Sequence, residues 1–140
     1  MLVPAVPRVL IVDDDASIRL MLHDLLDDCG LDVVGLASDG LEALDLIDRL
    51  LPDIVVLDVR MPGMGGIDLA RRLRGTAPSI RVVLFTAFDD PAVRLRAAEA
   101  GVFATVIKGQ HPGRLMQAIR EAWISGGLLD HQPGAAGGSS

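Results

Sequence analysis

The sequence predicts an α/β fold in which one parallel sheet has helices on both faces, a doubly wound arrangement. Five short apolar runs alternate with five stretches that have helical periodicity. Half of the residues are hydrophobic, but only 3% are aromatic, so Leu, Val, Ile and Ala must make the core. A chain of 140 residues is long enough to bury one such core. Strict alternation of strands and helices implies right-handed crossovers between parallel strands.

The five apolar runs are the predicted strands. They span residues 8–12, 32–37, 54–57, 81–85 and 104–107. The third run, Ile54-Val55-Val56-Leu57, contains only branched aliphatic residues, which is typical of a strand buried on both faces.

The segments between the strands predict five helices. Apolar residues recur at helical spacing in residues 18–26 and 41–51. Asp39 is the expected N-cap of the second helix, and Glu42 three residues later completes a capping box. The third helix is expected at 66–74, the fourth begins at Asp90-Pro91 and ends at Gly101, and the fifth spans 112–123.

Composition limits the domain organisation and the class of protein. We expect one domain at residues 8–124, a loosely held lead-in at 1–7, and a flexible Gly/Ser-rich tail or truncated linker at 125–140. The single cysteine, Cys29, excludes an internal disulfide and a Cys-rich zinc site, and we expect it to be buried. A net charge of -6 argues against direct nucleic-acid binding by this domain. With no membrane-spanning run or signal peptide in the sequence, we expect a cytoplasmic protein with no membrane contact.

Polar residues follow four of the predicted strands. Asp13 and Asp14 follow the first, Asp58 the third, Thr86 the fourth and Lys108 the fifth. Because the carboxyl ends of parallel strands meet at one edge of a sheet, these side chains are expected to form one pocket. Its carboxylates suit Mg²⁺, and its hydroxyl and ammonium suit the oxygens of a phosphoryl group. This chemistry favours Asp58 as a nucleophile that accepts a phosphoryl group.

These residues resemble a known family. Val12-Asp13-Asp14, the segment from Leu57 to Gly66 (LDVRMPGMGG), Thr86-Ala87 and Lys108 together resemble the receiver domain of two-component response regulators, over residues 8–123. The resemblance implies a flavodoxin-like (βα)₅ fold with strand order 2-1-3-4-5. It also implies that Asp58 accepts a phosphoryl group from a phosphohistidine of a sensor histidine kinase or phosphotransfer protein. Such a domain is no enzyme in the ordinary sense, since it catalyses only its own phosphotransfer and dephosphorylation.

The resemblance implies a role for each residue of the pocket. Asp14, Asp58 and the backbone carbonyl of Arg60 would bind Mg²⁺ directly, and Asp13 would act largely through water. Thr86 would move toward the phosphoryl oxygens, and Lys108 would pair with them. The output surface would be the fourth helix, fifth strand and fifth helix, about residues 90–123, which would bind an output domain, a protein effector or a second copy in a homodimer.

The sequence departs from the family pattern at three positions. Thr105 stands where a Tyr or Phe usually couples to the switch Thr, and Phe103 lies two residues earlier. Gly109 replaces the common Pro after Lys108, and Gly65 replaces a common Asp, a change that we take as nearly neutral. A further prediction concerns Arg60, whose side chain is expected to reach the pocket mouth and tune dephosphorylation.

Two other functions stay open. A haloacid-dehalogenase-like phosphatase also has an aspartate nucleophile in an Asp-x-Asp motif after the first strand, here Asp13-x-Asp15. It would require a further acidic pair at a strand end after the lysine, and it would leave Asp58 without a role. We expect Asp15 to be a helix N-cap instead. A receiver-like interaction module that is never phosphorylated is the other alternative.

The nature of the output also stays open. Residues 115–127 resemble the end of receivers that precede a helix-turn-helix DNA-binding domain. The chain is thus either a stand-alone receiver or part of a larger regulator.

Overall fold

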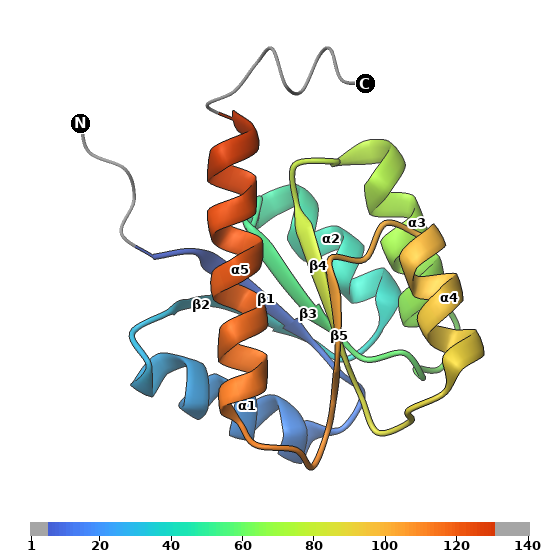
Figure 1. The fold of residues 1–140 in the computed structure, drawn as a ribbon, viewed down its shortest axis with the longest axis horizontal. Coiled ribbons are helices and arrows are strands. Elements are labelled where there is room, and N and C mark those ends of the chain that lie inside the picture. Colours follow the sequence, from blue (N-terminus) through green and yellow to red (C-terminus); the bar gives the residue numbers. More distant parts are fainter. Residues whose placement is uncertain (1–5, 131–140) are drawn as a thin grey trace.

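A computed structural model describes residues 6–130, and Figure 1 shows a central sheet between two layers of helices. Helices α1 and α5 cover one face of the sheet, and α2, α3 and α4 cover the other (Figure 1). The strands are β1 (Arg8–Val12), β2 (Asp32–Ala37), β3 (Ile54–Leu57), β4 (Arg81–Thr86) and β5 (Ala104–Ile107). The helices are α1 (Ala16–Asp28), α2 (Gly40–Leu50), α3 (Gly66–Thr76), α4 (Pro91–Glu99) and α5 (Gly113–Asp130).

The sheet is parallel throughout and has the order β2-β1-β3-β4-β5. The predicted fold class and strand order are therefore confirmed, and β4 extends one residue further than predicted, to Thr86. Val12 at the end of β1 pairs with Leu57 at the end of the central strand β3, so the residues that follow these two strands leave the sheet side by side.

The core lies on both faces of the sheet. Leu10 and Leu57 pack toward α2, α3 and α4, whereas Ile11 and Val56 pack toward α1 and α5. All residues of β3 are buried, as its uninterrupted aliphatic sequence predicts.

The helix starts follow the sequence signals, with one difference. Asp15 caps α1 by accepting the backbone N–H of Ser17 at 2.8 Å, and Asp39 caps α2 by accepting that of Glu42 at 2.8 Å. Glu42 Oε1 accepts the backbone N–H of Ser38 at 2.7 Å, so the box closes one residue before the N-cap. Asp90 caps α4, and Pro91 occupies its first turn, as expected.

Two sequence predictions are wrong. Helix α5 continues to Asp130, so the predicted start of the tail at Ser125 lies inside a helix. Extending an established helix by one residue costs less free energy than nucleating a new helix. This lower cost offsets the penalty of about 1 kcal/mol that each of Gly126 and Gly127 imposes inside a helix. The rest of the predicted tail, 131–140, and residues 1–5 of the lead-in lie outside the described residues. Cys29 is exposed rather than buried, because it is the C-cap of α1, beyond the last buried residue, Leu26.

In the part of the chain that the structure describes, no helix is both long and apolar enough to cross a membrane.

Candidate functional site

The structure brings the predicted site residues together at the carboxyl edge of the sheet. Asp13 follows β1, Asp58 follows β3, Thr86 ends β4 and Lys108 follows β5. Asp13, Asp58 and Thr86 are only 2%, 8% and 1% exposed, and they are the buried polar residues among those described. Buried polar groups are costly unless they are paired, so this cluster is a strong candidate for a functional site.

Three carboxylates lie close enough to share a cation. Asp13, Asp14 and Asp58 each offer an oxygen within 4.8 Å of the others. Asp14 is exposed, so it faces the solvent side of the cluster. Oxygen ligands of this kind suit a hard divalent cation such as Mg²⁺, which retains several waters.

One ammonium group lies between two of these carboxylates. Lys108 Nζ donates a hydrogen bond to Asp13 Oδ2 at 2.8 Å and lies 3.5 Å from Asp58 Oδ2. Lys108 is also the only lysine in the sequence, a signal that singles it out without any structure. The cluster therefore contains a fixed positive charge beside the predicted nucleophile.

Burial and neighbouring charges change the proton affinities of this pair. Burial raises the pKa of Asp58 above its ordinary 3.8, the positive charge of Lys108 opposes this, and the negative charge of Asp13 adds to it. For Lys108, burial alone would lower the pKa, but the hydrogen bond to Asp13 and the charges of Asp58 and Asp13 outweigh burial and raise it. Asp58 is therefore a carboxylate whose negative charge is only partly compensated.

Backbone and side-chain contacts hold Asp13 in place. Its Oδ1 accepts the backbone N–H of Asp15 at 2.9 Å, and its own N–H donates to the carbonyl of Ala37 at 3.0 Å. Arg19 Nη1 donates to the Asp13 carbonyl at 2.7 Å. Arg19 could not be identified from the sequence, since it is a single arginine between Ile18 and Leu20 on α1 with no pattern that marks it.

The loop after Asp58 makes a close approach that requires glycine. A Cβ at Gly66 would lie 2.1 Å from the backbone oxygen of Asp58, far inside van der Waals contact. The N–H of Gly66 also donates to the Val59 carbonyl at 2.9 Å. The first turn of α3 therefore packs directly against the backbone of Asp58.

The switch candidate Thr86 is linked to the loop that follows it. Its hydroxyl oxygen accepts the backbone N–H of Phe88 at 3.2 Å. The ring of Phe88 in turn lies under the guanidinium of Arg60, with Cζ 3.8 Å from the ring centroid. The Arg60 side chain thus contacts the loop after β4, a contact that the sequence did not predict.

Thr105 and Gly109, where the sequence departs from the family pattern, lie in β5 and in the turn that follows it. Thr105 pairs with Leu84 in the sheet, so it lies on the same face as Thr86, two residues further along β4. Phe103 precedes β5 and is 36% exposed. Gly109 has φ +87°, a left-handed conformation that glycine adopts at little cost.

The family model and the relatives that match this chain point to the same family. Residues 9–120 match the family model described as the response regulator receiver domain. The chain is 36% identical over 114 residues to the chemotaxis protein CheY of Thermotoga maritima, a match that covers 81% of this chain and 95% of CheY. It is 40% identical over 114 residues to the response regulator GacA of Pseudomonas viridiflava, covering 81% of this chain and 53% of GacA.

A solved structure agrees with these matches. The two-component response regulator of the LuxR family from Aurantimonas sp. SI85-9A1 superposes with a TM-score of 0.83 at 35% identity, covering 86% of this chain and 87% of that chain. The chain spans nearly all of CheY but only about half of GacA. The similarity therefore concerns one domain, which some relatives combine with further sequence.

Proposed function

The chain belongs to the response regulator receiver domain family of two-component systems, and we propose that Asp58 is the residue that accepts the phosphoryl group. The main support is the position of Asp58: it is 8% exposed at the end of β3, and Lys108 Nζ lies 3.5 Å from its Oδ2. A buried carboxylate beside a fixed cation suits attack on an electrophilic phosphorus.

The acidic trio fits a magnesium ion. In this proposal Asp14, Asp58 and the backbone carbonyl of Arg60 would bind Mg²⁺ directly, and Asp13 would act largely through water. The ion would neutralise negative charge on the phosphoryl group. The exposure of Asp14 leaves room on the solvent side for the waters that Mg²⁺ retains.

The chain's own residues perform the remaining steps. A carboxylate oxygen of Asp58 attacks the phosphorus of a phosphohistidine, an O–P bond forms as the N–P bond breaks, and the histidine nitrogen leaves with the bonding electrons. Lys108 stays within reach of Asp58 and pairs with a phosphoryl oxygen. Thr86 accepts a hydrogen bond from Phe88, which leaves its own hydroxyl proton available to donate to another phosphoryl oxygen. Later attack by water on phosphorus breaks the bond between phosphorus and the Asp58 oxygen, so that Asp58 leaves as a carboxylate and inorganic phosphate is released.

The signal is proposed to leave through the surface of α4, β5 and α5. Thr86 and Thr105 lie on the same face of neighbouring strands, so a movement of Thr86 has a short route to β5. We propose that a cytoplasmic sensor histidine kinase or phosphotransfer protein supplies the phosphoryl group. This surface would bind an output domain or a protein effector. Two copies of the chain would form a homodimer through the same surface.

The structure offers less support for the phosphatase alternative. Asp15, the second acid of its Asp-x-Asp motif, caps α1 through its side chain. Asp58 would have no role in that chemistry, although it is buried and one of its carboxylate oxygens lies within 4.8 Å of those of Asp13 and Asp14. A receiver-like module that is never phosphorylated is the rival that an experiment must exclude.

Intact-mass analysis tests the proposal. Incubation with acetyl phosphate and Mg²⁺ should add the mass of one phosphoryl group to the protein, and Asp58→Asn should abolish the gain. Asp48→Asn, on the exposed side of α2, is the matched control and should be labelled like the parent chain. No mass gain in the parent would overturn the proposal, and sustained turnover of a generic phosphate ester would favour the phosphatase.

A further inference from the structure

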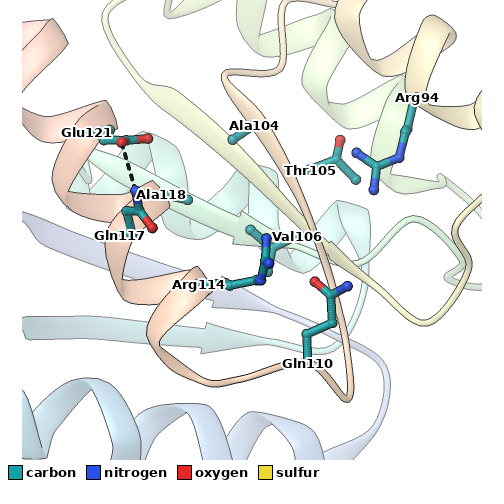
Figure 2. Close-up of a pocket in the computed structure, with 9 residues that line it drawn as sticks. All are labelled: Arg94, Ala104, Thr105, Val106, Gln110, Arg114, Gln117, Ala118 and Glu121. Atoms are coloured by element: carbon teal, nitrogen blue, oxygen red, sulfur yellow. Dashed lines mark hydrogen bonds between the residues drawn. The ribbon is translucent and has the colours of Figure 1, made fainter.

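A hollow of about 300 Å³ lies at the edge of the sheet, between α4 and α5. Figure 2 shows the residues that line it, which come from α4, β5, α5 and the turn before α5. Its polar lining comprises Arg94, Thr105, Gln110, Arg114, Gln117 and Glu121.

Small side chains leave this space open. Strand β5 is an edge strand that pairs only with β4, and three of its consecutive residues line the hollow. Two of them, Ala104 and Thr105, are small, and Ala118 lines the hollow from α5. No large side chain from β5 therefore occupies the gap between the two helices.

The hollow has a positive lining in a chain whose net charge is -6. Arg94 and Arg114 approach it from two different helices (Figure 2). Arg94 Nε donates to Asp89 Oδ1 at 2.8 Å, and within residues 6–130 no partner contacts the two terminal nitrogens of that guanidinium. Among the described residues, no hydrogen-bond or ion-pair partner contacts the guanidinium of Arg114, whose backbone N–H donates to the His111 carbonyl at 3.0 Å. The acid on the rim, Glu121, already accepts a hydrogen bond from Gln117 Nε2 at 3.2 Å (Figure 2).

We propose that this hollow binds a carboxylate side chain in an acidic peptide segment of a partner protein. Guanidinium groups bind planar carboxylates through paired hydrogen bonds, and two of them here flank one space. The amide of Gln110 provides a further donor. The edge of β5 offers backbone groups to an extended peptide on either side of the bound carboxylate.

The hollow is close in sequence to Lys108, which lies beside the proposed phosphorylation site. Lys108, which pairs with Asp13, and Gln110, which lines the hollow, belong to one turn in which the N–H of Gln110 donates to the Ile107 carbonyl at 3.4 Å. A phosphoryl group that draws Lys108 away from Asp13 would act on the turn that also carries Gln110, and we expect phosphorylation to alter the hollow through this turn. The hollow lies within the surface of α4, β5 and α5 proposed above for output, so its role as a partner site rests on the proposed function, whereas its affinity for a carboxylate is measured without phosphorylation.

Amide NMR of the full ¹⁵N-labelled chain, without Mg²⁺ or phosphoryl donor, tests the binding. The probe is a capped hexapeptide of glutamate, and a capped hexapeptide of glutamine is its neutral match. The glutamate peptide should give saturable shifts at Thr105, Gln110 and Gln117. Arg94→Gln and Arg114→Gln should each weaken binding about tenfold, as expected for the loss of a charge-assisted hydrogen bond. Arg72→Gln, on the exposed side of α3, is the control and should leave the affinity unchanged.

Three results would overturn the inference. The first is equal shifts with the glutamine peptide, and the second is unchanged affinity in both arginine variants. The third is a set of concentration-dependent shifts at the same residues without peptide, together with a dimer in sedimentation, which would make a second copy the occupant. Labelling by acetyl phosphate should persist in both arginine variants. Failure of labelling at Asp58 would overturn the proposed function and leave the peptide result intact.

Discussion

The guanidinium of Arg60 lies over the ring of Phe88, with Cζ 3.8 Å from the ring centroid. Arg60 is in the loop after β3 and Phe88 in the loop after β4, so this contact connects two loops that border Asp58. The backbone N–H of Phe88 also donates to the hydroxyl of Thr86. The pair thus links the residue whose carbonyl is proposed to bind Mg²⁺ with the loop next to the proposed switch hydroxyl.

Breaking this contact should accelerate hydrolysis of the proposed phosphoryl-Asp58. A cation–π contact at an exposed position contributes about 0.5–1 kcal/mol, so Phe88→Ala should raise the dephosphorylation rate about 2–5-fold by loosening both loops. The rate is measured as loss of the phosphoryl mass after removal of acetyl phosphate.

A double-mutant cycle separates the contact from the two side chains themselves. Arg60→Ala and the double variant should hydrolyse at rates close to that of Phe88→Ala, because each removes the same interaction. Independent, multiplicative effects would show that the contact between Arg60 and Phe88 has no part in the lifetime.

Magnesium should stabilise the fold through the acidic trio. A ligand that binds only the folded state at 100 times its dissociation constant adds about 2.7 kcal/mol to the free energy of unfolding. We expect Mg²⁺ to raise the Tm of the parent chain. Asp14→Asn should remove most of this rise, because it removes one of the proposed ligands. The substitution itself should cost the fold little stability, because Asp14 is exposed.

Thermal unfolding over a series of Mg²⁺ concentrations measures this effect. Asp48→Asn removes the same charge from α2 and should keep the full response. A parent chain whose Tm is the same in Mg²⁺ and in chelator would contradict the proposed metal site.

The fold could be predicted from the sequence because strong local signals agreed with each other. The aliphatic strands and the alternation of elements determined the sheet, and the strand ends determined which polar residues meet, from Asp13 to Lys108. Chain direction alone brings these residues together, because the carboxyl ends of all strands in a parallel sheet lie at the same edge.

Features that depend on three-dimensional packing could not be predicted in this way. The contact between Arg60 and Phe88 joins two exposed loops that have no periodic pattern. The hollow beside Thr105 exists because small residues of β5 and α5 meet, which only the packing of these elements reveals. The end of α5 was misjudged because Gly126 and Gly127 are typical of linkers, although an existing helix can continue through them.

Asp58→Asn should stabilise the fold at neutral pH in the absence of divalent cations. The folded-state pKa of Asp58 lies above its ordinary 3.8, chiefly because burial disfavours the charged form. The stability associated with this group is therefore fully present below pH 3.8 and is lost as the pH rises through the folded-state pKa. Asparagine avoids this loss, so the variant should unfold at higher denaturant concentration than the parent at about pH 7.5.

The pH dependence is the decisive part of this test. The difference in the free energy of unfolding should shrink as the pH falls toward 3.8, where Asp58 in the parent chain becomes neutral as well. Urea titrations in chelator at several pH values measure it, with Asp48→Asn as the control. An advantage for Asp58→Asn that does not decrease on acidification would show that a cause other than the buried charge is responsible.

Gly66→Ala should be strongly destabilising, because the added Cβ would lie 2.1 Å from the backbone oxygen of Asp58. Backbone atoms on both sides must then move, and overpacking of this kind costs about 1–3 kcal/mol or more. The same helix provides the matched control, since a Cβ at Gly75 meets no atom within 4 Å. Gly75→Ala should gain up to about 1 kcal/mol through helix propensity. Urea unfolding of the two variants should therefore give changes of opposite sign, and a Gly66→Ala variant as stable as the parent would show that α3 does not pack closely against Asp58.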